Sequence, residues 1–167
     1  LADCALAQMA QALGHPDDSA LLRKRGGNWH NVWDAGVRDA DTGFSGFPRP
    51  RLEDGSWYAP SDDRYSPRSQ HGFHEGTAWQ YQWLVQQDIP GMLQAMHGSE
   101  QAGQRLDAFF AYDDLLKDPL NAARTHWVVG PYSYYNQYRY NPNNEPDLHA
   151  PWMYTLIGQP WKTATVV

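Results

Sequence analysis

The sequence predicts an all-α fold built from helical hairpins, arranged as part of a toroid with long loops. Three observations support this prediction. Apolar residues recur at helical spacing in several segments, Gly or Pro ends most of these segments, and the longest polar stretches lie between them. No segment repeats at a period of about 20–50 residues, so a solenoid is not expected. We treat residues 1–167 as a single segment of one domain.

Two helices are expected first, at about 1–14 and 16–33. In the first helix, apolar residues such as Met9 and Leu13 share one face, and Gly14 is a typical residue to end it. Pro16 suits the first turn of the second helix, whose apolar face continues to residue 33. Two helices joined by a short turn form an antiparallel hairpin.

Residues 34–72 are rich in Gly and Pro, so no long element is expected there. Short strands at 44–51 and 56–58 would form a hairpin that turns at Asp54-Gly55. Because long irregular segments inside compact domains are usually functional, this segment is expected to form a wall over a site.

Helical patterns return in the second half of the chain. The expected helices are 77–86, 91–96, one that begins at Ser99, and two that begin at Pro151 and Pro160. The helix at 77–86 is apolar nearly all round and is therefore expected to be buried. The segment after Asp118-Pro119 is assigned no type, and the Tyr- and Asn-rich residues 132–146 are expected to be irregular.

Composition excludes some classes of function. The net charge is −6, so a basic surface for nucleic acid is not expected, and no apolar run is long enough for a membrane span. The chain has 8 Trp, 10 Tyr and 5 Phe, which suit either an aromatic core or a wet cleft for polar, ring-shaped ligands. The single cysteine, Cys4, is expected to be a buried structural thiol.

Glu75 is the candidate catalytic residue. It lies at a junction between a loop and a helix, and Phe73 and Trp79 are expected to remove water from it. A carboxyl held protonated in this way can act as a general acid. The alternative is that Glu75 only caps the following helix. His71, His74 and Glu75 do not have the spacing of a zinc-binding helix, so a zinc site is not expected.

A second polar segment, 141–152, is held extended by its prolines. It carries Asn144, Glu145, Asp147 and His149, whose side chains suit a calcium ion or the hydroxyl groups of a sugar. The alternative is that Asn and Asp residues beside proline simply form turns.

Four segments together resemble glycoside hydrolase family 92. Residues 75–81 (EGTAWQY) resemble the family's EGNAWQY, and residues 88–93 (DIPGML) resemble its HDVxGL segment. Residues 144–149 (NEPDLH) resemble NEPSHH, and Tyr154 with residues 158–163 (GQPWKT) resembles YxYAGQPWKT. The order and spacing agree over essentially the whole chain.

This resemblance implies a calcium-dependent, inverting exo-α-mannosidase, secreted or periplasmic, acting on terminal α-linked mannose of mannosides or N-glycan-type mannans. The chain would be the central part of an (α/α)6 catalytic barrel, with the N-terminal β-sandwich and the remainder of the barrel outside it. Glu75 falls on the general acid, and Asn144, Glu145 and His149 fall in the segment that binds substrate. The calcium ligands are not assigned.

Departures from the family pattern leave alternatives open. Thr77 replaces Asn, and Asp147-Leu148 replaces Ser-His, so the preferred leaving sugar or linkage is not predicted. The family's general-base carboxylates lie in a motif beyond these 167 residues, so the chain alone is expected to be inactive. The alternatives are a non-catalytic carbohydrate-binding fragment and a mannose-1-phosphate diester hydrolase of the same family.

Overall fold

The computed structural model of the chain describes residues 1–60, 65–129 and 137–167. Its helices are α1 (Ala2–Ala12), α2 (Pro16–Gly26), α3 (Ala78–Tyr81), α4 (Ile89–Ala95), α5 (Ser99–Phe110), α6 (Tyr112–Leu115), α7 (Pro119–His126), α8 (Met153–Leu156) and α9 (Pro160–Val166). Short 3₁₀ helices cover Gly27–Val32, Gln86–Asp88, Glu145–Asp147 and Ala150–Trp152. Two strands, β1 (Trp33–Arg38) and β2 (Ser45–Pro48), form the sheet found in these ranges. The predicted helical class is therefore confirmed, with one small β-hairpin added.

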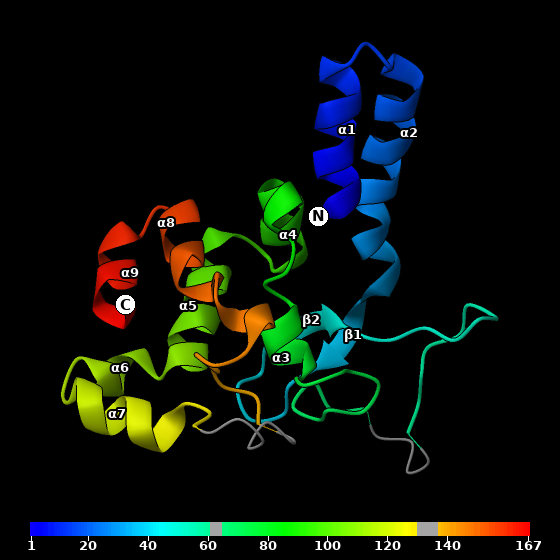
Figure 1. Ribbon diagram of the computed structural model, residues 1–167. Coiled ribbons are helices and arrows are strands. Elements are labelled where there is room, and N and C mark those ends of the chain that lie inside the picture. The colour runs from blue at the N-terminus through cyan, green and yellow to red at the C-terminus, as the bar shows by residue number, and fades with distance from the viewer. Residues whose placement is uncertain (61–64, 130–136) are drawn as a thin grey trace.

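The first hairpin, α1 and α2, projects away from the rest of the molecule (Figure 1). Gly14 makes the turn with a φ of 78°, and the Ser19 hydroxyl on α2 donates to the Ala7 carbonyl on α1 over 2.8 Å. The predicted hairpin is confirmed, but its apolar stripe is not covered: Met9 is 59% exposed and Leu13 62%. In the described ranges, no helix is long and apolar enough to cross a membrane.

The prediction that the second helix continues to residue 33 is wrong. The α-helix α2 ends at Gly26, and a 3₁₀ helix leads into β1. Two consecutive glycines, Gly26 and Gly27, weaken a helix at this point, and Trp33 instead pairs with Pro48 in an antiparallel ladder. Cys4 packs against Gly26 and is half-buried, not buried as expected.

The predicted hairpin between 44–51 and 56–58 is only partly present. The first strand exists as β2 but pairs with β1, and the second segment contributes a single bridge between Arg51 and Trp57. The expected turn is confirmed, since Gly55 has a φ of 82° and its N–H donates to Leu52.

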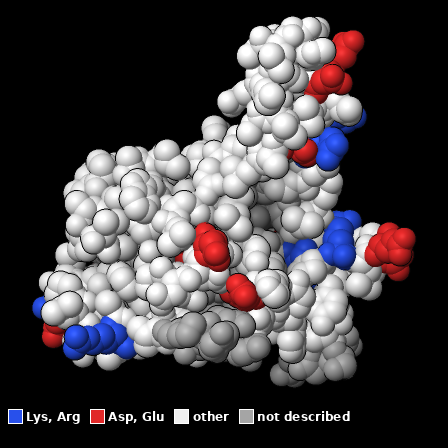
Figure 2. Space-filling view, in the orientation of Figure 1, with Lys and Arg blue, Asp and Glu red and all other residues white. Residues whose placement is uncertain are grey.

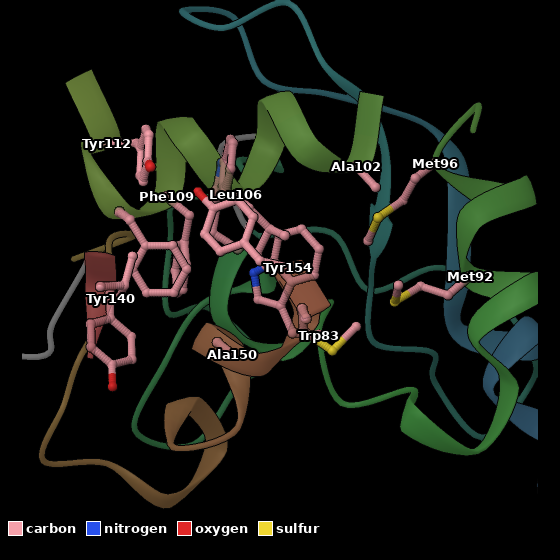
Figure 3. Packing of buried hydrophobic residues seen from close by; sticks show 14 of the residues in the cluster. Trp83, Met92, Met96, Ala102, Leu106, Phe109, Tyr112, Tyr140, Ala150 and Tyr154 are labelled. Atoms are coloured by element: carbon pink, nitrogen blue, oxygen red, sulfur yellow. The ribbon is translucent and has the colours of Figure 1, made fainter. Parts of the chain in front are cut away.

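The hydrophobic core lies against α5 (Figure 3). The predicted inner stripe of α5 is confirmed, because Ala102, Leu106, Phe109 and Phe110 are fully buried. Phe110 packs against Tyr140, with ring centroids 4.9 Å apart, and against Tyr154 at 5.7 Å. Met92 and Met96 extend the core toward α4. The aromatic residues therefore form the core and also, as shown below, a cavity wall.

The helix predicted at 77–86 is present only as the four residues of α3, although Trp79 and Trp83 are fully buried as expected. The segment that sequence left unassigned forms α7, and the Asp118 carboxylate caps it by accepting the Asn121 N–H over 3.2 Å. Of the Tyr- and Asn-rich segment, residues 132–136 lie outside the described residues.

Arg105 fixes α5 to the small sheet. Its guanidinium is buried, and Nη1 donates to the Gly46 carbonyl over 2.9 Å and to Gln82 Oε1 over 3.0 Å. Burial lowers the pKa of Arg105 to about 10, with the charge of Asp39 acting in the opposite direction. In the described ranges, the Arg105 guanidinium is stabilised mainly by contacts with neutral oxygens and with aromatic rings.

Candidate active site

Glu75 lies in the turn that enters α3, and its backbone is strained. Its φ of 54° is in the left-handed region, which a non-glycine residue adopts at a cost of about 1–3 kcal/mol. Its side chain is 42% exposed, and Oε1 lies 3.5 Å from His74 Nε2. The carboxyl is therefore open to a ligand.

The expectation that Phe73 and Trp79 hem in Glu75 is wrong for the described residues. The Trp79 ring is fully buried, and its indole N–H donates to Asp39 Oδ2 over 2.8 Å. Phe73 instead packs against Tyr81, with ring centroids 5.2 Å apart. Both rings are near Glu75 along the chain, but Trp79 packs into the core against Phe47, and Phe73 packs against Tyr81.

Local hydrogen bonds hold the Glu75 turn against α3. The Thr77 N–H donates to Gln80 Oε1 over 2.8 Å, which is one half of a capping box. The Tyr81 hydroxyl donates to the His74 carbonyl over 2.7 Å. The backbone is thus anchored on both sides of Glu75 by side chains of α3.

The structure brings the second predicted segment to the same place. The Asn144 side-chain amide donates to the Glu75 carbonyl over 2.5 Å, although the two residues are 69 positions apart. Asn144 is buried, whereas Glu145 is exposed at the start of its 3₁₀ helix. Both candidate segments therefore meet at one site, where the Glu75 carboxyl is partly exposed and Glu145 is exposed.

His149 anchors the end of this segment. Its Nε2 lies 2.7 Å from the Trp83 carbonyl, so Nε2 carries the proton and Nδ1 is left as an acceptor. Burial lowers the pKa of His149, and the bond to Trp83 opposes this only in part. A neutral His149 can offer a substrate one nitrogen, Nδ1.

Asp147 was expected, with its neighbours, to suit a calcium ion or sugar hydroxyls, but its side chain faces the protein interior. It is fully buried, and Oδ2 accepts the Asn141 backbone N–H over 2.8 Å. Burial raises the pKa of Asp147 to about 8. No sequence pattern marks its burial, which depends on how this segment packs against α3.

An aromatic cavity of about 360 Å³ lies next to this turn. Trp29, Trp33, Phe73 and Tyr81 line it together with Arg49 and residues of the predicted wall segment. Figure 2 shows acidic side chains near the centre of the face seen there, and further acidic side chains together with basic ones toward its left and right edges. In the described ranges, no group of three His, Cys, Asp or Glu residues is placed to hold a metal ion.

Comparison with known proteins identifies the family. The profile of the glycosyl hydrolase family 92 catalytic domain matches residues 1–167. A search of curated proteins gave no match. The solved structure of the GH92 family glycosyl hydrolase ccman5 is 25% identical, with a TM-score of 0.66, and the match covers 96% of this chain and 19% of that one.

A second solved structure agrees. The family GH92 inverting mannosidase BT2199 from Bacteroides thetaiotaomicron VPI-5482 is 25% identical, with a TM-score of 0.65, over 96% of this chain and 20% of that one. The chain thus spans about a fifth of the length of these relatives. The helical fold and the profile match over the whole chain agree, and the chain belongs to glycosyl hydrolase family 92.

Proposed function

We propose that the full-length protein is an exo-acting α-mannosidase that releases terminal α-linked mannose with inversion, and that Glu75 is its general acid. The observation that carries the proposal is the contact between Asn144 and the Glu75 carbonyl, which joins the two segments singled out by sequence. Their helical frame would form the central part of an (α/α)6 barrel.

The roles of the residues follow from their exposure. Glu75 would donate a proton to the departing glycosidic oxygen, which needs an accessible carboxyl. The partly exposed Glu75 carboxyl, the exposed Glu145 carboxyl and Nδ1 of His149 would accept hydrogen bonds from sugar hydroxyls. An inverting enzyme also needs a carboxylate that activates water about 6.5–9.5 Å from the acid, and we place this base outside these 167 residues.

Calcium dependence of the full-length protein is part of the proposal. Calcium takes about 6–8 oxygen ligands, and the described residues do not bring three carboxylates together. We therefore propose that other parts of the full-length protein supply calcium ligands. Loss of activity in a chelator and its return with added calcium would support the dependence; unchanged activity would contradict it and leave the Glu75 assignment intact.

We also propose that the protein acts outside the cytoplasm, in the periplasm or the medium. Cell fractionation with an activity assay tests this, and activity confined to the cytoplasm would contradict it.

The central experiment is Glu75→Gln in the full-length protein. Turnover of an α-mannobioside should fall by about 10²–10⁴-fold, because a sugar leaving group must be protonated. Turnover of a dinitrophenyl α-mannoside should fall far less, because its dinitrophenolate group leaves without protonation. Glu53→Gln, an exposed residue near the Asp54-Gly55 turn, is the matched control and should change neither rate.

Mannobioside turnover that survives Glu75→Gln would contradict the assignment. Hydrolysis of a mannose-1-phosphate diester without hydrolysis of mannobioside would favour the phosphodiester alternative, and binding without turnover would favour the non-catalytic one.

A further inference from the structure

Asp147 is a buried carboxyl with no cation beside it. Its Oδ1 is buried and has no hydrogen-bond partner in the described parts of the chain. Asp39 is equally buried, but Arg68 Nε lies 2.6 Å from its carboxylate. An unpaired buried charge costs far more than a neutral acid, so the two carboxyls are in different protonation states at neutral pH.

The groups around Asp147 do not favour its charge. Burial raises the pKa of Asp147 to about 8, and polar contacts with the Asn141 backbone and the Gln80 side chain oppose this only in part. Burial also raises the pKa of Tyr81, which faces Glu75 as well as Asp147, and the pKa of Tyr140, so neither hydroxyl supplies a positive charge to pair with Asp147. On its own segment, the ionisable neighbours are Glu145 and His149, neither of which is ion-paired to it in the described ranges.

Asp147 lies at the junction of the two candidate segments. Its N–H donates to the Asn144 carbonyl over 3.0 Å, and its carboxyl holds the Asn141 N–H. Asn144 in turn donates to the Glu75 carbonyl. A short chain of contacts therefore leads from Asp147 to the backbone of Glu75.

A second route runs through Gln80. Gln80 lies on α3, which packs against the 3₁₀ helix that contains Asp147, and its Oε1 accepts the Thr77 N–H at the start of α3. Its Nε2 donates to the Arg139 carbonyl over 3.0 Å. A change at Asp147 thus reaches the α3 end of the Glu75 turn as well as the Asn144 end.

We propose that Asp147 is a positioning residue for the general acid: as a neutral carboxyl it locks the 141–147 turn and, through Asn144 and Gln80, sets the direction of the Glu75 side chain. The inference rests on the function proposed above. Ionisation of Asp147 would place a charge in a site that has no counter-ion, loosen the turn and lower kcat.

The test compares Asp147→Asn and Asp147→Ala in the full-length protein across pH, with mannobioside as substrate. Asn has the same shape and never ionises, so kcat at about pH 6 should stay within about twofold of the wild type. The loss of kcat near pH 8 in the wild type should move to higher pH in Asp147→Asn. Asp147→Ala should lower kcat at every pH by about tenfold or more, with a smaller change in KM.

Two outcomes would overturn the inference: identical pH profiles for the wild type and Asp147→Asn, or equal damage by Asn and Ala. If Asp147→Asn does not fold, the free energy of unfolding of the wild type is measured across pH instead. A free energy that does not fall as pH rises toward 8 would show that Asp147 is not a neutral acid. Glu75→Gln separates the two proposals. If Glu75→Gln abolishes turnover and Asp147→Asn leaves the profile unchanged, only the positioning role fails.

Discussion

The Asn144 amide and the Glu75 backbone carbonyl form a hydrogen bond of 2.5 Å between segments 69 residues apart. Asn144 is buried, and Glu75 has a left-handed backbone. Asn144 therefore holds the strained Glu75 from a distant part of the chain. A hydrogen bond of this kind contributes about 0.5–1.5 kcal/mol to the free energy of unfolding. It stabilises the conformation that presents the Glu75 carboxyl.

Replacing Asn144 should therefore affect activity more than folding. Asn144→Ala removes the bond to Glu75, so kcat on mannobioside in the full-length protein should fall by about tenfold or more. The free energy of unfolding should drop by only about 1–2 kcal/mol. Steady-state kinetics and urea unfolding measure the two effects.

Asn143→Ala is the control for this change, because Asn143 takes part in the turn through its backbone N–H, which donates to Asn141 Oδ1. It should alter both quantities less. An Asn144→Ala protein with normal kcat would show that the bond does not position the acid.

The ion pair between Asp39 and Arg68 should stabilise the fold at neutral pH. Burial alone would raise the pKa of Asp39, but hydrogen bonds from Arg68, Thr42 and Trp79 outweigh it and hold this pKa at about 2. The folded-state pKa lies below the unfolded value of 3.8, so the contribution is present above about pH 4 and is lost as pH falls toward 2. Asp39→Asn should cost about 3–5 kcal/mol at pH 7.

Asp41 provides the matched comparison, because it contacts the same Arg68 but its side chain is 72% exposed. Asp41→Asn should change the free energy of unfolding by less than about 1 kcal/mol. Equal losses in the two variants, measured by urea unfolding, would contradict the dependence on burial.

Asp147 should have the opposite pH dependence. Its pKa is raised to about 8 in the folded protein, so the folded state keeps a proton that the unfolded state releases above about pH 4. Stability should fall as pH rises from about 4 to about 8, by up to about 1.4 kcal/mol per pH unit, and then level off. In Asp147→Asn this fall should be absent. Urea unfolding at several pH values measures it, and parallel curves would contradict it.

Gly46 should tolerate a side chain less well than Gly55, although both have φ near 80°. A Cβ on Gly46 would lie 3.0 Å from Trp33 Nε1 and 3.3 Å from the Ala95 carbonyl, whereas a Cβ on Gly55 would meet open space. Gly55→Ala should cost about 1 kcal/mol from backbone strain alone. Gly46→Ala should cost at least about 1 kcal/mol more, as measured by thermal unfolding, and equal costs would contradict the crowding at Gly46.

Helical periodicity predicted the fold class, the α1–α2 hairpin and the buried face of α5, because these depend on local spacing. It failed at residues 27–38 because strand pairing is non-local. Trp33 pairs with Pro48, and local spacing does not specify which segment a strand pairs with. It also overestimated α3, because the apolar residues after Tyr81 are buried in irregular backbone and do not continue a helix.

For the site, the sequence predicted which segments matter but not their environment. Glu75 and Asn144 were found by type and motif, and the structure places them in contact. The burial of each carboxyl was not predictable, because it depends on tertiary packing: Glu75, expected to be dry, is partly exposed, whereas Asp147 is fully buried.

The left-handed backbone of Glu75 has a consequence for protein engineering. Glycine adopts this conformation without penalty, so Glu75→Gly should gain roughly 1 kcal/mol of backbone energy while it removes the proposed acid. A screen that selects only for thermostability would then enrich inactive Glu75→Gly variants. At this residue, stability and catalytic activity would favour different side chains.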